Sequence, residues 1–315
     1  MDKLVILTGP TAVGKTSLSI NLAKAINGEI ISADSMQVYK GMNIGTAKIR
    51  PEEMQSVKHH LIDIIDPTEE FHVVKFKEMV KKAIKEIYEK KKIPIICGGT
   101  GFYIQAILYD IDFAKEDVDK SLRGKLEKFA DENGNEALHE KLKEVDEASA
   151  INIPAANRKR IIRALEFYHQ TGKRFSEHNA EQREKISPYN FAYFVLNDDR
   201  ELLYNRIDSR VDKMMEDGLI DEVKRLVNQG AKRGMTSMDG IGYKEILDYF
   251  EGNISLEETI ELIKKKSRNY AKRQLTWFRR EKEVIWIDRQ IYLTEQDALA
   301  HILFALKKKG IIEHV

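Results

Sequence analysis

The residues with the clearest chemical meaning form a glycine-rich loop near the N-terminus. The loop consists of Gly9, Pro10, Thr11, Ala12, Val13, Gly14, Lys15 and Thr16. It matches the full GxxxxGK[ST] pattern, in which backbone N–H groups and a helix N-terminus converge on phosphate oxygens. Lys15 supplies a positive charge, and the Thr16 hydroxyl suits Mg²⁺. The pattern predicts a phosphate ligand. Taken alone it suggests an ATP-like nucleoside triphosphate, and an ordinary glycine turn is the alternative.

A carboxylate follows the next apolar run of the chain. Asp34 comes directly after 30–33, where an α/β sheet places chemistry beside its phosphate loop. This position suits a catalytic carboxylate, whereas a helix cap formed by Asp34 or Ser35 is the structural alternative. Nucleotide hydrolases usually add a second carboxylate at the end of an apolar strand. Asp63 and Asp66 are the candidates here, although neither ends a clean apolar run.

A second glycine-rich segment, 98–101, has the sequence Gly-Gly-Thr-Gly and follows another apolar run. Backbone without side chains there would let a ligand approach closely, and a plain turn is equally consistent with the pattern. Cys97, just before it, is the only cysteine, which excludes an internal disulfide and a Cys₂His₂ zinc finger. Its apolar neighbours predict a small core residue rather than a nucleophile.

Basic and aromatic residues are interleaved between Ile263 and Lys282. Nine lysines and arginines lie in this segment against one acid, and they are accompanied by Tyr270 and Trp277. Such a mixture suits nucleic acid, since cations meet phosphates and aromatic rings stack on bases. A helix whose aromatic residues pack into the core is the alternative. A second basic cluster lies at 158–163. The net charge of +1 does not exclude nucleic-acid binding by either basic segment, because a nearly neutral total can hide a basic face.

Short strands alternating with helices must position these residues. The expected strands are Leu4–Thr8, Glu29–Ala33, Leu61–Ile65, Pro94–Cys97, Phe191–Leu196 and Val284–Ile287. The expected helices of this part are Lys15–Ile26, Val73–Lys92, a helix after 98–101, Arg200–Met215, Ile220–Gln229, Tyr243–Phe250 and Leu256–Arg280. This alternation predicts an α/β fold with a P-loop-containing parallel sheet covered by helices.

The pattern changes in the middle of the chain. From Asp117 to about Glu184 the sequence is charged, helical and poor in strand signals. We therefore expect an all-helical insertion domain at 113–187 within an α/β catalytic core formed by 1–112 plus 188–315. The tail from Lys307 is expected to be a frayed end.

Composition places the chain among folded globular proteins. Its 315 residues are 42% hydrophobic and 33% charged, and no run of eighteen apolar residues occurs. The N-terminus enters the glycine-rich loop almost at once and lacks a signal-peptide layout. These features predict a cytoplasmic protein without a membrane span, expected to be a monomer.

Seven segments, in order, resemble the bacterial tRNA dimethylallyltransferase (tRNA isopentenyltransferase) family. The matching segments are 9–16 (GPTAVGKT), 32–39 (SADSMQVY) with 43–48 (NIGTAK), 59–63 (HHLID), 98–103 (GGTGFY), 160–166 (RIIRALE), 241–245 (IGYKE) and 270–274 (YAKRQ). The resemblance runs from residue 1 to about 287. It implies transfer of a dimethylallyl group from dimethylallyl diphosphate to the N6 amine of the adenosine on the 3′ side of the anticodon.

The resemblance also assigns roles to single residues. Asp34 is expected to accept the proton of the adenine amine, which is a poor nucleophile. Gly14, Lys15, Thr16 and Mg²⁺ are expected to stabilise the leaving diphosphate. Thr100 is expected near the bridging oxygen or the amine, and Arg210 is a candidate diphosphate ligand. The loop 9–16 is thereby reinterpreted as a leaving-group site.

The target base must leave its stack to reach such a site. The residues that the resemblance assigns to tRNA are Asp34, Ser35, Met36, Gln37, Thr100, Arg123, Lys159, Arg160, Ile161, Ile162 and Arg163. The helical insertion is accordingly expected to close over the anticodon stem-loop. One departure is Asn157, where relatives carry an acidic residue, followed by Arg158 in place of the usual proline. The zinc finger of eukaryotic relatives is missing.

Three alternatives use some of the same residues. A small-molecule kinase would use the loop for ATP, but it leaves the basic segments and the helical insertion unexplained. An isopentenyltransferase for free adenine nucleotides shares the loop and does not need Arg123 or the cluster 159–163. An RNA-binding module with a structural phosphate site would keep RNA binding without activity.

Overall fold

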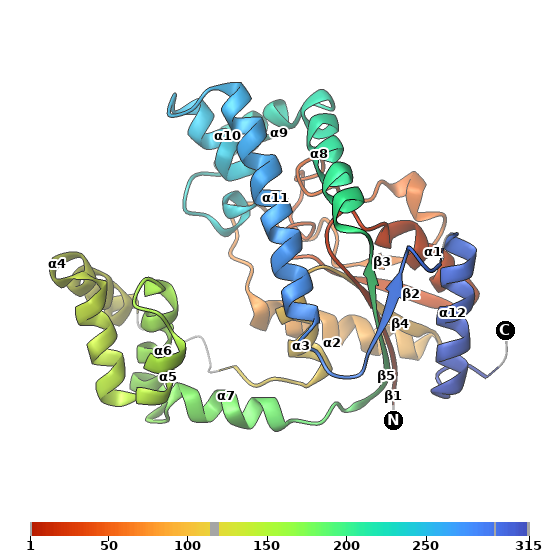
Figure 1. Ribbon diagram of the computed structural model, residues 1–315, viewed down its shortest axis with the longest axis horizontal. Helices are drawn as coiled ribbons and strands as arrows, with labels where there is room; N and C mark the ends of the chain where they lie inside the picture. The colour runs from red at the N-terminus through yellow and green to blue at the C-terminus, as the bar shows by residue number, and fades with distance from the viewer. Residues whose placement is uncertain (1, 114–119, 293, 314–315) are drawn as a thin grey trace. The chain divides into compact units, whose positions relative to one another are not determined.

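The computed structural model describes residues 2–113, 120–292 and 294–313 of the chain. The chain divides into two compact units. One consists of Met1–Leu108 together with Pro188–Val315, and the other of Tyr109–Ser187. Each unit has its own helices and its own apolar core, so each is described by itself (Figure 1).

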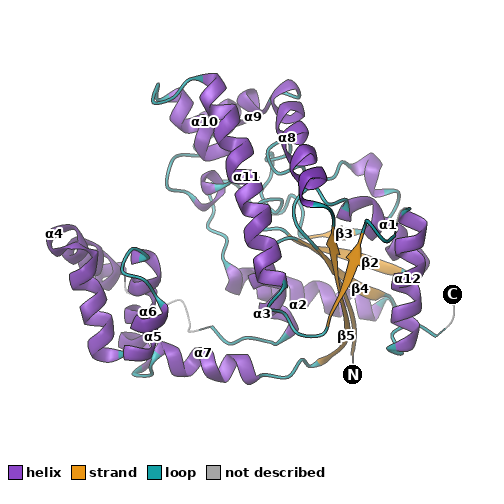
Figure 2. Cartoon of the chain, in the orientation of Figure 1, coloured by secondary structure: helices purple, strands orange, loops and turns teal. Residues whose placement is uncertain are grey.

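The first unit is built on one parallel six-stranded sheet (Figure 2). Its strands are β1 (Asp2–Thr8), β2 (Gly28–Ala33), β3 (His59–His60), β4 (Ile93–Gly98), β5 (Tyr189–Asn197) and β6 (Val284–Asp288), in the order β3-β2-β4-β1-β5-β6. The prediction of a helix-covered parallel sheet is confirmed. Gly98 pairs with both Thr8 and Ala33, so β1, β2 and β4 end at the same level. The segments that follow these three strands therefore meet at one edge of the sheet.

Helices cover both faces of this sheet. The helices of this unit are α1 (Lys15–Ala25), α2 (Val73–Glu89), α3 (Gly101–Leu108), α8 (Arg200–Glu216), α9 (Leu219–Asn228), α10 (Tyr243–Phe250), α11 (Leu256–Phe278) and α12 (Glu295–Lys308), with short 3₁₀ turns at Pro51–Met54 and Thr236–Asp239. On one face, α1 and α12 pack together, and α12 also contacts β5. On the other, α2 packs on β2, β4 and α3. The apolar side chains of α2 recur every three or four residues, so burying them against the sheet favours the helix.

The expected strand at Leu61–Ile65 is wrong. Pairing beside β2 is limited to His59–His60, and Ile65 forms only an isolated bridge with Tyr39. Leu61 and Asp63 adopt left-handed backbone angles, with φ of 63° and 54°. Because strand pairing needs extended backbone, these two residues end the strand although the segment is apolar.

The expectation of a frayed tail from Lys307 is also wrong, and the helix before it was missed. α12 begins at a capping box, in which the Thr294 side chain accepts a hydrogen bond from the N–H of Asp297. Beyond the end of α12, Ile311 and Ile312 are buried in the same core as β1 and α1. The end of the described chain is therefore fixed by burial of apolar surface.

The second unit is all helical. It contains α4 (Lys120–Val145), α5 (Glu147–Asn152), α6 (Arg158–Thr171) and α7 (Phe175–Glu184). α4 is interrupted at Gly134, where φ is 86° and ψ is 165°. The expected start of the helical stretch, Asp117, lies outside the described residues. α4, α5 and α6 pack around a small apolar core that includes Leu138, Leu142 and Leu165.

Within residues 2–113, 120–292 and 294–313, no helix combines the length and the apolar character needed to cross a bilayer.

Candidate active site

The glycine-rich loop connects the end of β1 to the first turn of α1. A Cβ atom on Gly9, whose φ is 149°, would lie 2.6 Å from the Leu196 carbonyl oxygen, and Gly14 is left-handed with φ of 91°. Both positions therefore require glycine. The Lys15 ammonium donates to the carbonyl oxygens of Gly9 at 3.0 Å and Pro10 at 2.7 Å. The lysine is thus held inside the loop at the start of a helix, where N–H groups lack intrahelical partners.

Three ionisable groups that are distant in the sequence lie around Lys15: Cys97 of β4, Asp34 after β2 and Arg210 of α8. Burial lowers the pKa of Lys15 to about 8; Cys97 and Asp34 act in the opposite direction, and Arg210 of α8 lowers it further. Burial also lowers the pKa of Arg210, although the residue keeps exposed surface. The structure therefore brings together three of the four predicted catalytic residues, Lys15, Asp34 and Arg210.

Asp34 directly follows β2 and faces this cluster. Its Oδ1 accepts hydrogen bonds from the N–H groups of Met36 at 2.8 Å and Gln37 at 3.2 Å. Burial raises the pKa of Asp34 above its ordinary value, while the two N–H groups, Lys15 and Lys48 oppose that rise. The alternative role as a helix cap is wrong, because no helix begins in the described residues that directly follow β2. The residues after Asp34 form a turn, and the Asp34 carboxylate accepts hydrogen bonds from two N–H groups of that turn. Ser35 lies in the same turn and is partly exposed.

The second glycine-rich segment lies beside the first because β4 is the neighbour of β1. The Thr100 N–H donates to the Ala33 carbonyl at 3.2 Å, which places Thr100 next to Asp34. The Tyr270 side chain of α11 lies close enough to the Thr100 side chain to interact with it, and burial together with Asp34 raises the pKa of Tyr270 to about 12. Thr100, the fourth predicted catalytic residue, is therefore at the same edge of the sheet.

Gln274 of α11 links the two glycine-rich segments. Its Oε1 accepts from the N–H of Thr11 at 2.9 Å, and its Nε2 donates to the Gly99 carbonyl at 2.9 Å. A Cβ on Gly99 would lie 2.1 Å from that Nε2. A Cβ on Gly101 would likewise lie 2.3 Å from the ring of Trp277. The glycines at 99 and 101 therefore let α11 approach. The sequence indicates the basic and aromatic character of α11 and the motif 270–274, but it does not reveal this role of Gln274.

A buried carboxylate outside the predicted set fixes the segment that follows Asp34. Glu222 of α9 accepts hydrogen bonds from the N–H groups of 43–45, at 2.9, 2.9 and 3.1 Å, and from the Tyr243 hydroxyl at 2.7 Å. The Thr46 carbonyl in turn accepts from the side-chain amide of Gln37 at 3.2 Å. Glu222 thus supports Gln37 through the backbone. Nothing in its sequence context signals this.

The two alternative carboxylates have local partners. Asp63 pairs with the buried ammonium of Lys48 at 2.5 Å, and Lys48 also donates to the Tyr39 carbonyl at 2.6 Å. Asp66 accepts from the N–H and the hydroxyl of Thr68, at 3.0 and 2.7 Å. Both therefore support turns. Cys97 behaves as expected of an inert thiol, because burial raises its pKa.

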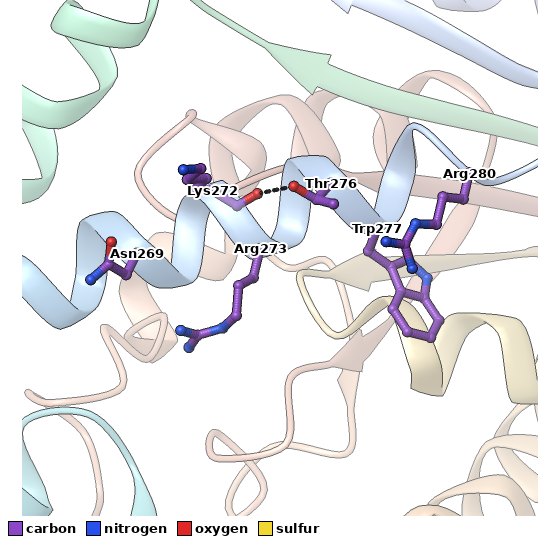
Figure 3. Close-up of a pocket in the computed structure, with 6 residues that line it drawn as sticks. All are labelled: Asn269, Lys272, Arg273, Thr276, Trp277 and Arg280. Atoms are coloured by element: carbon purple, nitrogen blue, oxygen red, sulfur yellow. Dashed lines mark hydrogen bonds between the residues drawn. The ribbon is translucent and has the colours of Figure 1, made fainter. Parts of the chain in front are cut away.

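The basic segment 263–282 divides into two parts. In its first half, Lys264, Lys266 and Arg268 pair with Asp212, Glu245 and Asp208 at 2.7, 2.6 and 2.5 Å. The second half lines a pocket of about 480 Å³ (Figure 3). The residues around it are Asn269, Lys272, Arg273, Thr276, Trp277 and Arg280. One side of this segment therefore packs on the glycine-rich segments, and another side presents cations and an aromatic ring to the pocket.

The residues assigned to RNA in the helical unit differ in exposure. Lys159 and Arg160 are exposed and Arg163 is partly exposed, whereas the side chains of Ile161 and Ile162 are buried. The last two therefore contribute through packing. The remaining residue assigned to RNA in this unit, the arginine at 123, pairs through Nε and Nη2 with a buried glutamate at 166, at 2.8 Å each. That ion pair joins α4 to α6.

The sequence departure at Asn157 lies at the start of α6. Its side chain forms no capping hydrogen bond. Arg158, the first helical residue, pairs with Asp131 of α4 at 2.7 Å. At this departure α6 therefore begins without a side-chain cap, and Arg158 forms an ion pair between two helices of the same unit.

Thr16 lies exposed in the first turn of α1, where its hydroxyl is accessible. The described residues hold no cluster of three or more His, Cys, Asp or Glu side chains arranged to bind a metal. A Mg²⁺ ion at Thr16 would therefore depend on oxygens from a bound diphosphate and from water, which is the usual way in which proteins hold this ion.

The pKa shifts predict how activity depends on pH. Lys15 carries its charge below about pH 8, and Asp34 is ionised only above its raised pKa. We expect kcat/KM, which reports the free enzyme, to fall above about pH 8 and also on the acid side. Initial rates between pH 5 and 10 check this. A flat profile up to pH 10 would contradict a role for the Lys15 charge.

The fold and the site define an α/β enzyme whose ionisable groups surround a glycine-rich loop suited to a phosphorylated substrate. The family model described as IPP transferase matches residues 37–281. The chain belongs to this family. It is 57% identical over 313 residues to a tRNA dimethylallyltransferase of Lachnoclostridium phytofermentans, covering 99% of this chain and 100% of the relative.

Solved structures agree with this assignment. The chain resembles the full-length tRNA isopentenylpyrophosphate transferase of Bacillus halodurans with a TM-score of 0.74, 45% identity and all of both chains covered. It also resembles a eukaryotic dimethylallyltransferase whose crystal structures capture it acting on tRNA. That similarity has a TM-score of 0.84 and 29% identity, and covers 100% of this chain and 81% of the other.

Proposed function

We propose that this protein transfers a dimethylallyl group from dimethylallyl diphosphate to the N6 amine of the adenosine on the 3′ side of the tRNA anticodon. Diphosphate is the second product. The observation that carries the proposal is the placement of the Lys15 ammonium near both the Asp34 carboxylate and the Arg210 guanidinium. One site thus supplies both charge for a leaving diphosphate and an acceptor for the amine proton. The names of the relatives supply the substrates.

The leaving group gains negative charge as its carbon–oxygen bond breaks. In our proposal Gly9–Thr16 surrounds the diphosphate, and Lys15 exchanges its contacts with the Gly9 and Pro10 carbonyls for phosphate oxygens. Arg210 contacts the same group. Charge stabilisation inside a water-poor site contributes most where charge develops in the transition state.

The adenine amine becomes acidic as it attacks the allylic carbon. Asp34 then accepts its proton, and the N–H groups of Met36 and Gln37 hold the carboxylate in place. The raised pKa of Asp34 makes it a better base than an ordinary carboxylate. Thr100, which lies next to Asp34 and near Tyr270, is proposed to contact the bridging oxygen or the amine. The turn 34–37 receives the flipped base.

Mg²⁺ is proposed as the cofactor, with Thr16 as its protein ligand. The exposed hydroxyl at the start of α1 fits an ion held mainly by diphosphate and water. Bound there, Mg²⁺ would neutralise charge on the diphosphate. We further propose that the protein acts as a monomer in the cytoplasm.

The anticodon stem-loop is proposed to bind the exposed side chains of Lys159 and Arg160 in the helical unit, which gives this unit its function in RNA binding. The pocket along α11, with Lys272, Arg273 and Arg280, offers cations for phosphates on the catalytic unit. Trp277 offers an aromatic ring in the same pocket. A kinase or an enzyme for free adenine nucleotides would need neither region.

Mass analysis of tRNA nucleosides tests the function directly. Unmodified tRNA is incubated with the protein, Mg²⁺ and dimethylallyl diphosphate, then digested to nucleosides. We expect one adenosine per modified tRNA to gain the mass of a dimethylallyl group in place of one hydrogen. Phosphorylation of a small metabolite with ATP, without prenylated adenosine, would show that the proposal is wrong.

The RNA interface predicts a salt-dependent effect at Arg160. Replacing this exposed residue with alanine should weaken tRNA binding at low salt and lower the slope of log K against log salt by about one. Filter binding at several salt concentrations measures both quantities. Lys128, exposed on α4 and paired with Glu132 at 3.7 Å, is the matched control, and Lys128→Ala should behave like wild type. Equal tRNA affinity for Arg160→Ala and wild type would count against the interface.

A further inference from the structure

Arg289 contacts the glycine-rich loop from outside the residues matched by the family model. It directly follows β6, and its Nη1 donates to the Val13 carbonyl at 3.1 Å. A Cβ atom on Gly14 would lie 2.4 Å from the same nitrogen. The guanidinium group therefore rests against the peptide that joins Val13 to Gly14, and Gly14 leaves room for it.

Several contacts hold Arg289 in this position. Its N–H donates to the Asn197 carbonyl at 3.0 Å, which continues the pairing of β5 and β6. Its Nε lies 3.9 Å from Oδ2 of Asp198, a buried carboxylate that also accepts from the Gln290 side chain at 2.7 Å. Asp198 additionally pairs with Arg206. The guanidinium thus bridges a fixed acid on one side and the glycine-rich loop on the other.

Two physical effects of this contact favour an anion in the loop. A donor on the Val13 carbonyl polarises the peptide, which makes the Gly14 N–H a stronger donor. The guanidinium also adds a positive charge beside Gly14 that remains at any physiological pH.

We propose that Arg289 is a positioning residue that strengthens diphosphate binding by holding and polarising the Val13–Gly14 peptide. This inference rests on the proposed function of the loop as a diphosphate site. Arg289 acts through the loop backbone, so its effect falls on diphosphate affinity and leaves tRNA binding unchanged.

Calorimetric titration with inorganic pyrophosphate and Mg²⁺ tests the inference without requiring prenyl transfer. Arg289→Gln should bind pyrophosphate about tenfold more weakly than wild type, the size expected for losing one hydrogen bond to a charged group. Arg289→Lys keeps a charge and a donor, so it should recover part of the affinity. In steady-state assays, KM for dimethylallyl diphosphate should rise, while kcat and KM for tRNA stay the same.

Glu295→Gln is the matched control. Glu295 accepts from the Ser17 hydroxyl at 2.6 Å and from Asn21, so it joins α12 to α1 without contacting the loop 9–14. Its loss should not weaken pyrophosphate binding. Equal affinity of Arg289→Gln and wild type would overturn the inference and leave the proposed function intact. Equal loss in Arg289→Gln, Arg289→Lys and Glu295→Gln would also overturn it, because general loosening would explain the result.

Wild-type protein that fails to bind pyrophosphate would overturn both the inference and the proposed function. Thermal melting of each variant accompanies the titrations. If Arg289→Gln does not fold, Arg289→Lys decides, since it keeps the charge opposite Asp198. Its affinity should then lie measurably below that of wild type, and equal affinity would overturn the inference.

Discussion

Replacing Asp34 with asparagine should lower kcat for prenyl transfer about a thousandfold, the middle of the range for loss of a general base. Asparagine keeps an oxygen that can accept from the N–H groups of Met36 and Gln37, so the turn should persist. What is lost is the proton acceptor. Single-turnover kinetics with saturating tRNA and dimethylallyl diphosphate measure the effect.

Two further measurements separate catalysis from folding and binding. tRNA affinity of Asp34→Asn should stay close to that of wild type, which also distinguishes an enzyme from an RNA-binding module. Asp66→Asn is the matched control, because Asp66 is an exposed carboxylate that supports a local turn with Thr68. It should leave kcat unchanged. If Asp34→Asn retained most of the wild-type rate, another group would have to take the proton.

The second large effect is expected at Lys15. Lys15→Met removes the ammonium but keeps an unbranched apolar stem of similar length. We expect kcat/KM for dimethylallyl diphosphate to fall about 10²- to 10³-fold, as when one charge-stabilising group of an active site is removed. Stability should not suffer, because burial already disfavours the charged lysine and lowers its pKa to about 8.

Lys24→Met, at the far end of the same helix, is the control. Lys24 donates to the Gln55 side chain at 2.7 Å on the surface, away from the glycine-rich loop. Its kinetics should match those of wild type. If Lys15→Met left kcat and the KM for dimethylallyl diphosphate unchanged, the Lys15 ammonium would not contact the diphosphate.

Features encoded in consecutive residues could be predicted from the sequence. The segment from β1 through the loop to α1 has a local pattern, because an apolar run, two glycines and a helical repeat each leave their own signal. Asp34 could be placed because it follows an apolar strand, and parallel strands end at one edge. The strand expected at Leu61–Ile65 was wrong because the pattern of apolar residues does not reveal the left-handed backbone of Leu61 and Asp63.

The remaining parts of the site depend on contacts between distant residues. Gln274 accepts a hydrogen bond from the N–H of Thr11 across 263 positions, and Glu222 accepts one from the N–H of Asn43 across 179. Neither residue type nor local spacing distinguishes these side chains from ordinary surface residues. Gln274 belongs to the family motif YAKRQ, but the motif alone does not predict the function of this side chain. Arg289 lies outside all seven segments of the resemblance.

The central claim is that the loop Gly9–Thr16 holds a diphosphate that leaves as Asp34 takes a proton from the adenine amine. Quantifying pyrophosphate and prenylated adenosine from the same single-turnover reaction, with ATP absent, tests it most directly. We expect equal amounts of both products to appear at the same rate, and both to be lost together in Lys15→Met. Prenylated adenosine without matching pyrophosphate, or a requirement for ATP hydrolysis, would contradict it.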